Sequence, residues 1–449
     1  MDSRLKVLIV GGSITGLSLA LMLERVGIDF LLLEAHVDIA PELGASIGLC
    51  PNGLRILDQL SCYDSLQEKS QNHSVNNSWY GTLAGRKVKE FEGLGGAVIE
   101  RHGYPLSFID RRMLLQHLYD SLRQKHKVLT GKRVVSIVKS DDVAVMIRTE
   151  DGSSYTGDVL VGADGIHSRV RREMARLDPA HDYIESASLH AHWACLFGIS
   201  RNVPGIAKGD VGYVFGNRFS YLLGDGPGDR SYFFLTKRLQ KRVFGSDIPR
   251  FSDKDKEAFV KPHLDDHITS GLRFRDMYDK RMSSVLVPLE EIVYKRWHYG
   301  RIIAIGDSSS KMLPITGQGG NSAIENAAVL TNNLFDCLKT SPQNKPTVEQ
   351  LDTVFEKVQE LRTPRLQKFV TMANKRQAVD ALLTPELEEF ALTRMPQLQA
   401  EVILRGFQTE FGQAASLNML PVPYRPRTVP FADEQPQEKS KKGDIMAKL

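Results

Sequence analysis

The stretch over residues 5–33 decides the fold of this chain. It reads Leu-Lys-Val-Leu-Ile-Val over 5–10, then Gly11-Gly12-Ser13-Ile14-Thr15-Gly16, a helical pattern over 17–26 and a second apolar run over 29–33. An apolar run, a glycine turn and a helical segment in this order are typical of a β-α-β unit. The N–H groups of such a turn and the N-terminus of its helix can face a pyrophosphate. The sequence therefore predicts a dinucleotide-binding fold with Gly11 and Gly16 at the phosphates.

The ribose end of this site is expected at Glu34. Glu34 ends the second apolar run, 18 residues beyond Gly16. A carboxylate at this place can accept hydrogen bonds from the ribose hydroxyls of an adenosine and would repel a 2′-phosphate. The alternative is a glycine turn without a ligand, followed by a solvated glutamate. The turn and the acid at this spacing favour the dinucleotide.

Two later strands are expected to join the same sheet, which makes the nucleotide-binding domain discontinuous. The runs 159–161 and 302–305 end at Gly162-Ala163-Asp164-Gly165 and at Gly306-Asp307, and each resembles a nucleotide-contacting edge of a parallel sheet. We therefore predict an α/β chain with a Rossmann-like domain built from residues 1–75, 105–179 and 296–350. A mainly β substrate-covering domain is expected from 76–104 and 180–295. A helical region over 351–425 and a disordered tail over 426–449 complete the prediction.

A second anion-binding turn follows Gly306-Asp307. The segment Pro314-Ile-Thr-Gly-Gln-Gly-Gly-Asn321 places glycines before a helix, where free N–H groups suit the anionic reduced ring of a flavin. Asp307 is then expected to bind the hydroxyls of the linking sugar chain. The alternative is an ordinary strand-loop-helix joint with a capping aspartate.

Composition favours a small-molecule partner. The 449 residues are 42% hydrophobic and 25% charged, which is typical of a globular protein of two or three domains. A net charge of +4 with dispersed Lys and Arg argues against nucleic acid. The four cysteines form neither a CxxC pair nor a zinc pattern, so free thiols and no metal site are expected.

Taken together, these motifs resemble those of the FAD-dependent, aromatic-hydroxylase-like monooxygenases. Within that family the chain is similar to the fungal epoxidases that act on prenyl chains of meroterpenoids and indole diterpenes. The resemblance covers residues 5 to about 425. Its segments here are Val10–Leu17, Gly44–Gly48 with Pro51-Asn52-Gly53, Ile109-Asp110-Arg111, Gly162–Gly165, and Gly306-Asp307-Ser308 running on to Gly320-Asn321.

The resemblance implies a role for each matched residue. Glu34 is implied to bind the adenosine ribose and Arg111 to lie near the flavin phosphates, although Arg111 can also be a solvated charge at a helix start. Gly48 is implied to lie close to the cofactor, and Asp164 to serve both FAD and the nicotinamide reductant. Asp307 and Gly320 are implied to contact the ribityl chain and the ring. One departure is visible, since Ser310 stands where relatives commonly carry histidine.

The resemblance also implies a reaction. Reduced flavin reacts with O2 to give an electrophilic oxygen that an electron-rich alkene attacks without a base, whereas a phenol reacts better once deprotonated. Tyr221 is suggested to face the flavin as a catalytic residue, although such a tyrosine more often packs within a sheet. No second glycine fingerprint marks a standing NADPH site, so we expect NADPH to dock transiently.

Other classes of protein remain as alternatives. An aromatic hydroxylase acting on a phenol or a salicylate-type substrate shares the same motifs. A flavin halogenase is disfavoured because the three tryptophans are isolated, and a nicotinamide dehydrogenase leaves the Asp307 region unexplained. A flavin-binding interaction protein without catalysis stays open.

The expected location is the cytoplasm. No signal peptide and no run of about 18 apolar residues is visible, so we expect a cytosolic enzyme, either soluble or peripherally associated with a membrane, that draws an apolar substrate from a bilayer. The ending Ala447-Lys448-Leu449 differs at one position from the Ser-Lys-Leu peroxisomal address, which makes the peroxisome the alternative.

Overall fold

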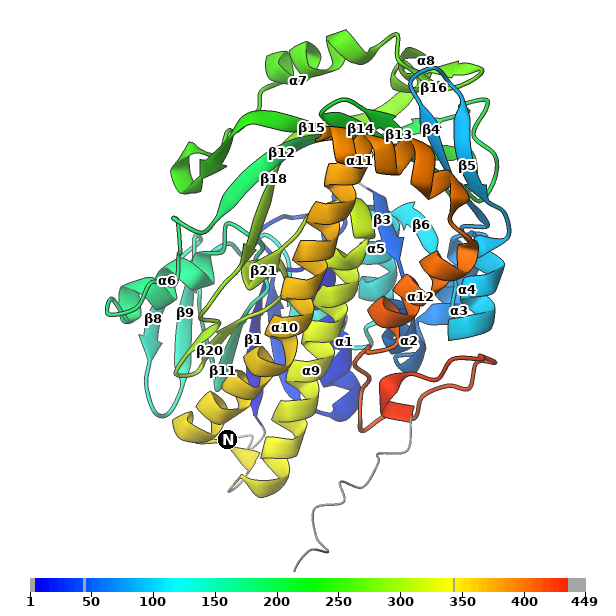
Figure 1. Cartoon of the computed structure of the whole chain (residues 1–449). Coiled ribbons are helices and arrows are strands. Elements are labelled where there is room, and N and C mark those ends of the chain that lie inside the picture. The colour runs from blue at the N-terminus through cyan, green and yellow to red at the C-terminus, as the bar shows by residue number, and fades with distance from the viewer. Residues whose placement is uncertain (1–4, 43–45, 342–343, 435–449) are drawn as a thin grey trace, which may run out of the picture.

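A computed structural model describes residues 5–42, 46–341 and 344–434 of the chain. Its central element is a six-stranded sheet in the order β19-β20-β11-β1-β2-β7 (Figure 1). All neighbours pair in parallel except β19 and β20. The strands are β1 Lys6–Val10, β2 Asp29–Leu33, β7 Val128–Leu129, β11 Val159–Gly162, β19 His298–Tyr299 and β20 Ile302–Ala304. The predicted α/β class with a Rossmann-like domain and a parallel sheet is confirmed, and the three glycine turns of the sequence lie at neighbouring strand ends.

Alternation within these strands explains the layers on the two faces of the sheet. Val7 and Ile9 point into the larger core cluster, whereas Leu8 and Val10 point into a separate one. Helices cover the first face: α1 (Ile14–Val26), α5 (Arg111–Ser121) and α9 (Gln318–Thr340). The second face is covered by α6 (Arg169–Leu177) and by a three-stranded sheet of β8 (Val134–Ser140), β9 (Val145–Thr149) and β10 (Ser154–Gly157).

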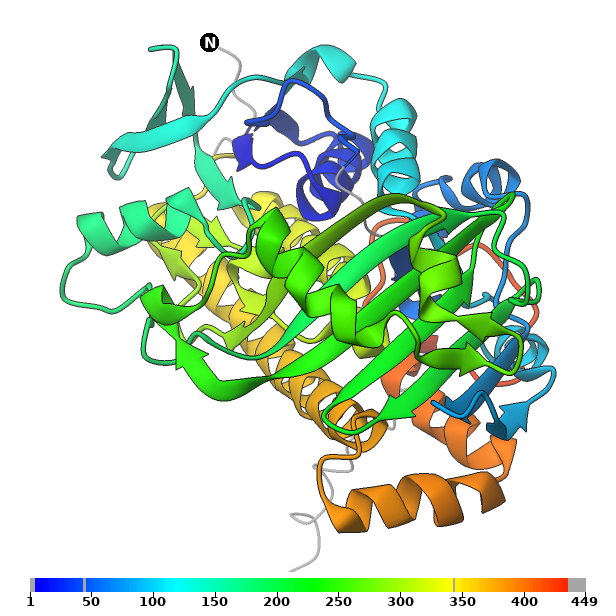
Figure 2. The ribbon, with the colours of Figure 1, turned by 90° about the horizontal axis from the view of Figure 1, so that it is seen from above.

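A second, eight-stranded sheet lies above the nucleotide-binding part (Figure 2). Its order is β21-β18-β12-β15-β14-β13-β4-β5, and only β13 and β4 pair in parallel. The segments 76–104 and 180–295 both contribute strands to it. Its strands are β4 Asn77–Thr82, β5 Lys87–Phe91, β12 His190–Arg201, β13 Asp210–Gly216, β14 Phe219–Asp225, β15 Arg230–Phe244, β18 Arg281–Val293 and β21 Ser310–Lys311.

The two faces of this large sheet have different neighbours. One face packs against the short helices α7 (Asp253–Val260) and α8 (Phe274–Tyr278), with the two-stranded β16 (His267–Thr269) and β17 (Leu272–Arg273) beside them. The other face lies toward the nucleotide-binding part and the antiparallel pair β3 (Ser46–Leu49) and β6 (Ser107–Asp110). A cleft therefore forms between the inner face of the large sheet and the ends of the parallel strands.

The remaining helices surround this frame. The longest, α10, spans 33 residues antiparallel to α9 and continues through Pro364 (Figure 1). The other helices are α2 Pro51–Gln59, α3 Tyr63–Lys69, α4 Leu94–His102, α10 Val348–Asp380, α11 Pro385–Glu389 and α12 Ala400–Phe411.

The prediction of a disordered tail from residue 426 is wrong for residues 426–434. Phe431 is completely buried, and the guanidinium of Arg55 on α2 lies 4.2 Å from the centroid of its ring. Arg55 also pairs with Asp433 and Glu434 at 2.9 and 3.1 Å. Prolines and charges are typical of disordered segments, but burial of one phenylalanine against a buried arginine holds this one in place. The rest of the predicted tail, including Ala447-Lys448-Leu449, lies outside the described residues.

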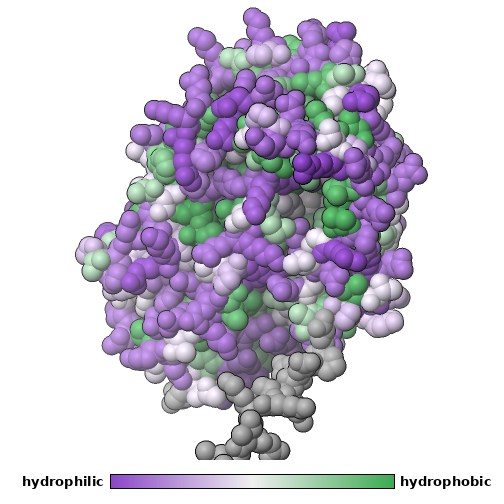
Figure 3. Space-filling view, in the orientation of Figure 1, coloured by the Kyte–Doolittle hydropathy of each residue, from purple (hydrophilic) through white to green (hydrophobic). Residues whose placement is uncertain are grey.

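On the face shown in Figure 3, hydrophilic side chains predominate and apolar ones are scattered. Among the described helices, none combines the length and the apolar character that crossing a bilayer requires. All four cysteines are free thiols.

Candidate functional site

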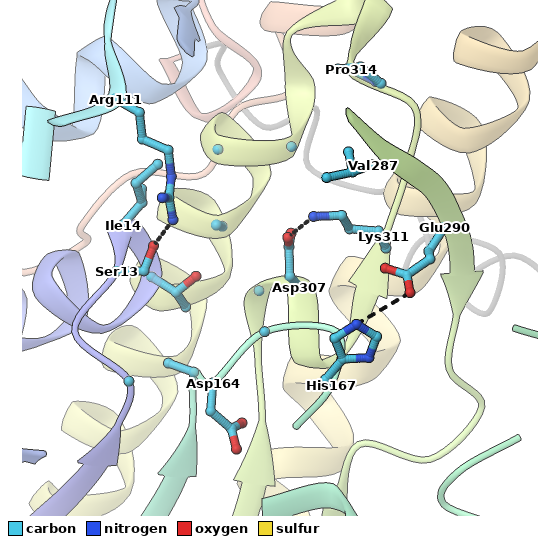
Figure 4. A pocket seen from close by; sticks show the side chains of 18 of the residues that line it. Ser13, Ile14, Arg111, Asp164, His167, Val287, Glu290, Asp307, Lys311 and Pro314 are labelled. Carbon is cyan, nitrogen blue, oxygen red and sulfur yellow. Dashed lines mark hydrogen bonds and ion pairs between the residues drawn. The ribbon is translucent and has the colours of Figure 1, made fainter. Parts of the chain in front are cut away.

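A cleft of about 1100 Å³ lies where the parallel strands end beneath the large sheet (Figure 4). Open α/β sheets bind ligands in this position, outside the carboxyl ends of their strands. Seven of the eight predicted cofactor residues line it: Gly11, Glu34, Gly48, Arg111, Asp164, Asp307 and Gly320. The eighth, Gly16, lies in the first turn of α1 and packs beneath the glycine turn.

The glycine turn has no room for a side chain at two positions. Gly11 has φ +107°, and a Cβ added there would clash with the backbone carbonyl of Ala163. A Cβ on Gly16 would clash with the carbonyl oxygen of Gly11. The two glycines thus let the turn lie against the neighbouring strand β11, which leaves the N-terminus of α1 open to the cleft. That arrangement suits a pyrophosphate.

Glu34 fixes the same turn from the end of β2. Its carboxylate accepts hydrogen bonds from the N–H of Gly12 at 2.5 Å and from the N–H of His36 at 2.7 Å. A carboxylate offers about four acceptor positions, so two remain for sugar hydroxyls. Glu34 therefore combines a structural contact with the predicted place for a ribose.

The opposite end of the cleft is formed by β3 and the start of α9. Asn321 joins them, because its side-chain amide donates to the carbonyls of Gly48 (3.0 Å) and Gly317 (2.7 Å) and its oxygen accepts from the N–H of Cys50 (3.1 Å). Gly317 has φ +68° and precedes α9, so the first N–H groups of that helix open onto the cleft beside Gly320. This helix end suits an anionic group.

Arg111 and Asp307 lie between the two ends. Arg111 donates to the hydroxyl oxygen of Ser13 at 2.6 Å (Figure 4). Burial lowers the pKa of Arg111, and the negative charges of Asp307 and Glu34 oppose that shift. Asp307 forms an ion pair with Lys311 four residues later. The cleft therefore offers both cationic groups, which suit phosphates, and carboxylates, which can accept hydrogen bonds from sugar hydroxyls.

The carboxylate of Asp164 is held by the N-terminus of α6. It accepts hydrogen bonds from Ser168 Oγ and the N–H of Arg169, both at 2.6 Å, and from the N–H of Val170 at 3.0 Å. Burial raises its pKa, and these hydrogen bonds oppose the shift. Asp164 thus stabilises the N-terminus of α6 at the border of the cleft, and its role toward FAD and the reductant stays a prediction.

The expectation that Tyr221 faces the flavin is wrong. Its side chain is completely buried on the other face of the large sheet, against Phe274 of α8. The hydroxyl donates to Asp266 at 2.7 Å. Neighbours in a strand point to opposite faces, and here Leu222 points inward while Tyr221 points outward.

Replacing Tyr221 with phenylalanine is expected to leave FAD binding and turnover within about twofold of the parent protein. Loss of one hydrogen bond to a carboxylate should lower the free energy of unfolding by about 1.5–3 kcal/mol. Chemical denaturation and flavin titration measure the two quantities separately. If turnover of Tyr221→Phe fell more than tenfold while its flavin content stayed full, Tyr221 would be a catalytic residue after all.

The sequence did not single out three polar residues that line the cleft, namely His167, Glu290 and Lys311. His167 Nε2 lies 3.5 Å from Glu290 Oε1, and Lys311 pairs with Asp307 (Figure 4). Burial raises the pKa of Glu290, and the nearby His167 opposes that shift. His167 follows the Asp164-Gly165 turn by two residues, a signal available in the sequence. Glu290 comes from the middle of β18, where nothing distinguishes it from a solvated strand residue.

The residues present fit FAD. Ser322 Oγ and Asn326 Nδ2 belong to nearly completely buried residues on α9 that border the cleft, and within the described residues neither atom has a hydrogen-bond partner. Such groups are normally satisfied in a folded protein, so the wall of the cleft formed by α9 keeps unused hydrogen-bonding capacity just behind its surface. A phosphate-binding turn, a ribose carboxylate and a second helix N-terminus complete the set. In the described part of the chain, no group of three or more His, Cys, Asp or Glu side chains is placed to hold a metal ion.

Comparisons with known proteins agree with this site. The FAD binding domain family matches residues 4–345. FAD-dependent monooxygenase olcE of Penicillium canescens is 37% identical over 430 residues, which cover 94% of this chain and 90% of that protein. FAD-dependent monooxygenase spyC of Aspergillus fumigatus is 36% identical over 435 residues, with 94% and 89% covered.

Solved structures share the fold. HpxO of Klebsiella pneumoniae in complex with FAD and uric acid superposes with a TM-score of 0.72 at 22% identity, over 92% of this chain and 97% of that one. A tetracycline destructase, Tet(51), gives 0.66 at 16% identity, over 94% and 100%. The match of the family over three quarters of the chain and the near-complete alignment with these relatives lead to one conclusion: this chain belongs to the FAD binding domain family, among the fungal FAD-dependent monooxygenases.

Proposed function

We propose that this chain is an FAD-dependent monooxygenase of fungal secondary metabolism that uses NADPH and O2. Its substrate is an apolar small molecule, and the reaction is epoxidation of a prenyl double bond of a meroterpenoid or a related metabolite. The observation that carries the proposal is that the dinucleotide cradle opens directly onto an apolar, aromatic wall formed by the large sheet and β6.

The aromatic wall is formed by Phe108, Phe197 and Phe234. The rings of Phe197 and Phe234 meet edge to face with centroids 4.9 Å apart, and those of Phe108 and Phe234 do so at 6.3 Å. Val287 and Leu289 of β18 extend the apolar surface along the cleft. A wall of this composition binds a hydrocarbon chain through contact area and offers it no charged partner.

The chain's own residues bind, orient and shield. FAD supplies, when bound, transfer of two electrons from NADPH and activation of O2 toward an electron-rich carbon. The N–H groups around Gly11 hold the phosphates, Glu34 holds the ribose, and Asp307 orients the sugar chain that leads to the ring. The phenylalanine wall excludes water from the space where the double bond lies.

Epoxidation suits the apolar wall, because the side chains of Phe108, Phe197 and Phe234 cannot act as a base. An alkene gives up electrons without first losing a proton, whereas a phenol reacts better after deprotonation. Aromatic hydroxylation is the second candidate, and His167 with Glu290 is the observation that favours it, because this titratable pair borders the cleft. Glu290 would then be the base.

Mass spectrometry of reaction products separates the two candidates. The purified holoenzyme is incubated with NADPH, O2 and prenylated phenols, together with analogues whose prenyl chain is saturated. Epoxidation predicts one added oxygen, conversion to a diol on mild acid treatment, and no product from the saturated analogues. A product with a new phenolic hydroxyl, formed equally from the saturated analogues, would refute it and establish the hydroxylase.

A further inference from the structure

A fully buried cluster of charges lies behind the start of α9, outside the residues assigned to the cofactor so far. It consists of Glu325 on α9 and of Arg362 and Arg365 on α10, whose side chains are 0%, 3% and 9% exposed. Arg365 binds both oxygens of Glu325, with Nε and Nη2 each at 2.8 Å. Arg362 pairs with the same carboxylate through Nη1. The three residues form one compact ionic unit.

This unit is separated from the cleft by a single layer of side chains. Arg362 Nε donates to Asn326 Oδ1 at 2.6 Å, and Asn326 borders the cleft. On the other side, Asn52 at the start of α2 donates to Glu325 Oε1 at 2.6 Å and to Gln318 Oε1, in the first turn of α9, at 3.0 Å. The cluster therefore contacts α9 directly and, through Asn52, the start of α2 that follows β3, close to the end of the cleft that β3 and the start of α9 form.

The charges of the cluster do not cancel. One carboxylate faces two guanidinium groups, which remain protonated in proteins. Although burial raises the pKa of Glu325, Arg365 and Arg362 lower it to about 2, so the carboxylate is ionised at neutral pH. One positive charge is left over.

A further carboxyl group close to Arg365 offsets only part of this excess. It belongs to Glu410, whose backbone carbonyl accepts a hydrogen bond from Arg365 at 2.7 Å. Burial raises the pKa of Glu410 to about 7, so near neutral pH the carboxyl group is only partly ionised. The neighbouring Arg376 forms its own pair with Asp380 and adds no net charge.

We propose that the Glu325–Arg362–Arg365 cluster raises the reduction potential of the bound FAD. A positive charge inside the protein is weakly screened and acts over several ångströms. The reduced flavin ring with N1 deprotonated carries one more negative charge than the oxidised ring, so the excess charge stabilises the reduced form more. The three residues act through charge and position, since none of them touches the cleft. The inference rests on the proposed use of FAD.

Charge-changing variants test the inference through the midpoint potential of bound FAD, measured by equilibration with redox dyes at constant pH. Glu325→Gln keeps the shape and brings the cluster to two positive charges, so the potential should rise. Arg365→Gln leaves the cluster neutral, so the potential should fall. The double variant has one positive charge again. Its midpoint potential should therefore return to nearly the parent value, with a residual shift that is a small fraction of either single shift. Arg365→Lys keeps the charge and should leave the potential unchanged.

Opposite shifts that cancel in the double variant distinguish charge from structural damage. A merely structural role would move both single variants in the same direction, and that result, or no shift in Arg365→Gln, would overturn the inference. If Glu325→Gln fails to fold, Arg365→Gln compared with Arg365→Lys still decides. A parent protein that binds no FAD would refute the proposed function itself, whereas one that binds FAD and oxidises NADPH without these shifts would refute only the inference.

Discussion

Replacing Gly11 with alanine is expected to abolish FAD binding. Gly11 has φ +107°, a region that costs a side-chain-bearing residue about 1–3 kcal/mol. The added methyl group would also clash with the carbonyl of Ala163, so the turn must move away from β11. Because the phosphates are held by N–H groups of this turn, its displacement removes them from their places. The ratio of flavin to protein absorbance after purification measures the loss.

A matched variant separates the clash from the strain of the backbone. Gly152 has φ +83° but no heavy atom within 4 Å of the position of an added Cβ. Gly152→Ala should therefore lower the free energy of unfolding by about 1–2 kcal/mol and keep full flavin content. Normal flavin content in Gly11→Ala would show that the dinucleotide is not bound by this turn.

Removing the carboxylate of Asp307 is the second change expected to have a large effect. In Asp307→Ala the sugar chain loses charge-assisted hydrogen bonds of about 1.5–3 kcal/mol each. Since about 1.4 kcal/mol corresponds to a factor of ten, loss of one such bond weakens FAD binding by about tenfold to a hundredfold. The Kd for FAD, measured by fluorescence titration of the apoprotein, tests this.

The control for Asp307 uses another ion pair at a similar spacing. Asp336 and Lys339 form an exposed pair on α9, 60% exposed on both sides and outside the residues that border the cleft. Asp336→Ala should leave the Kd for FAD unchanged. An Asp307→Ala protein with parental affinity would mean that the carboxylate only forms its pair with Lys311.

Much of the cofactor site followed from the sequence, because its signals are local. The turn from Gly11 to Gly16, the acid Glu34 and the glycines before α9 each combine a strand end with a fixed backbone requirement. Parallel strands end at a common edge, so three such turns far apart in sequence were expected to meet. The structure brings them together around one cleft. The assignment to a family followed from the order of the same motifs.

The tertiary structure decided which face and which neighbours the side chains between these turns contact. The alternation of β14 predicts that Tyr221 and Leu222 point to opposite faces, but only the packing of α7 and α8 decides which face is outside. The carboxylate of Asp164 accepts hydrogen bonds from the N-terminus of α6, an arrangement that depends on where that helix begins. Residues 426–434 look disordered by composition, yet Arg55 and Phe431 fix them through contacts between segments about 375 residues apart.

The Glu325–Arg362–Arg365 cluster likewise could not be predicted from the sequence. Glu325 and Arg362 are 37 residues apart on two helices, and each alone resembles an ordinary charged residue on a helical surface. Periodicity and motifs report what one segment requires of its own backbone, and they predicted the α/β fold together with the glycine turn and the acid Glu34 that line the cleft. Which charged side chains become buried together depends on the packing of α9 against α10. That packing fixes their desolvation and mutual attraction, so only the folded chain determines the electrostatic environment of the cofactor.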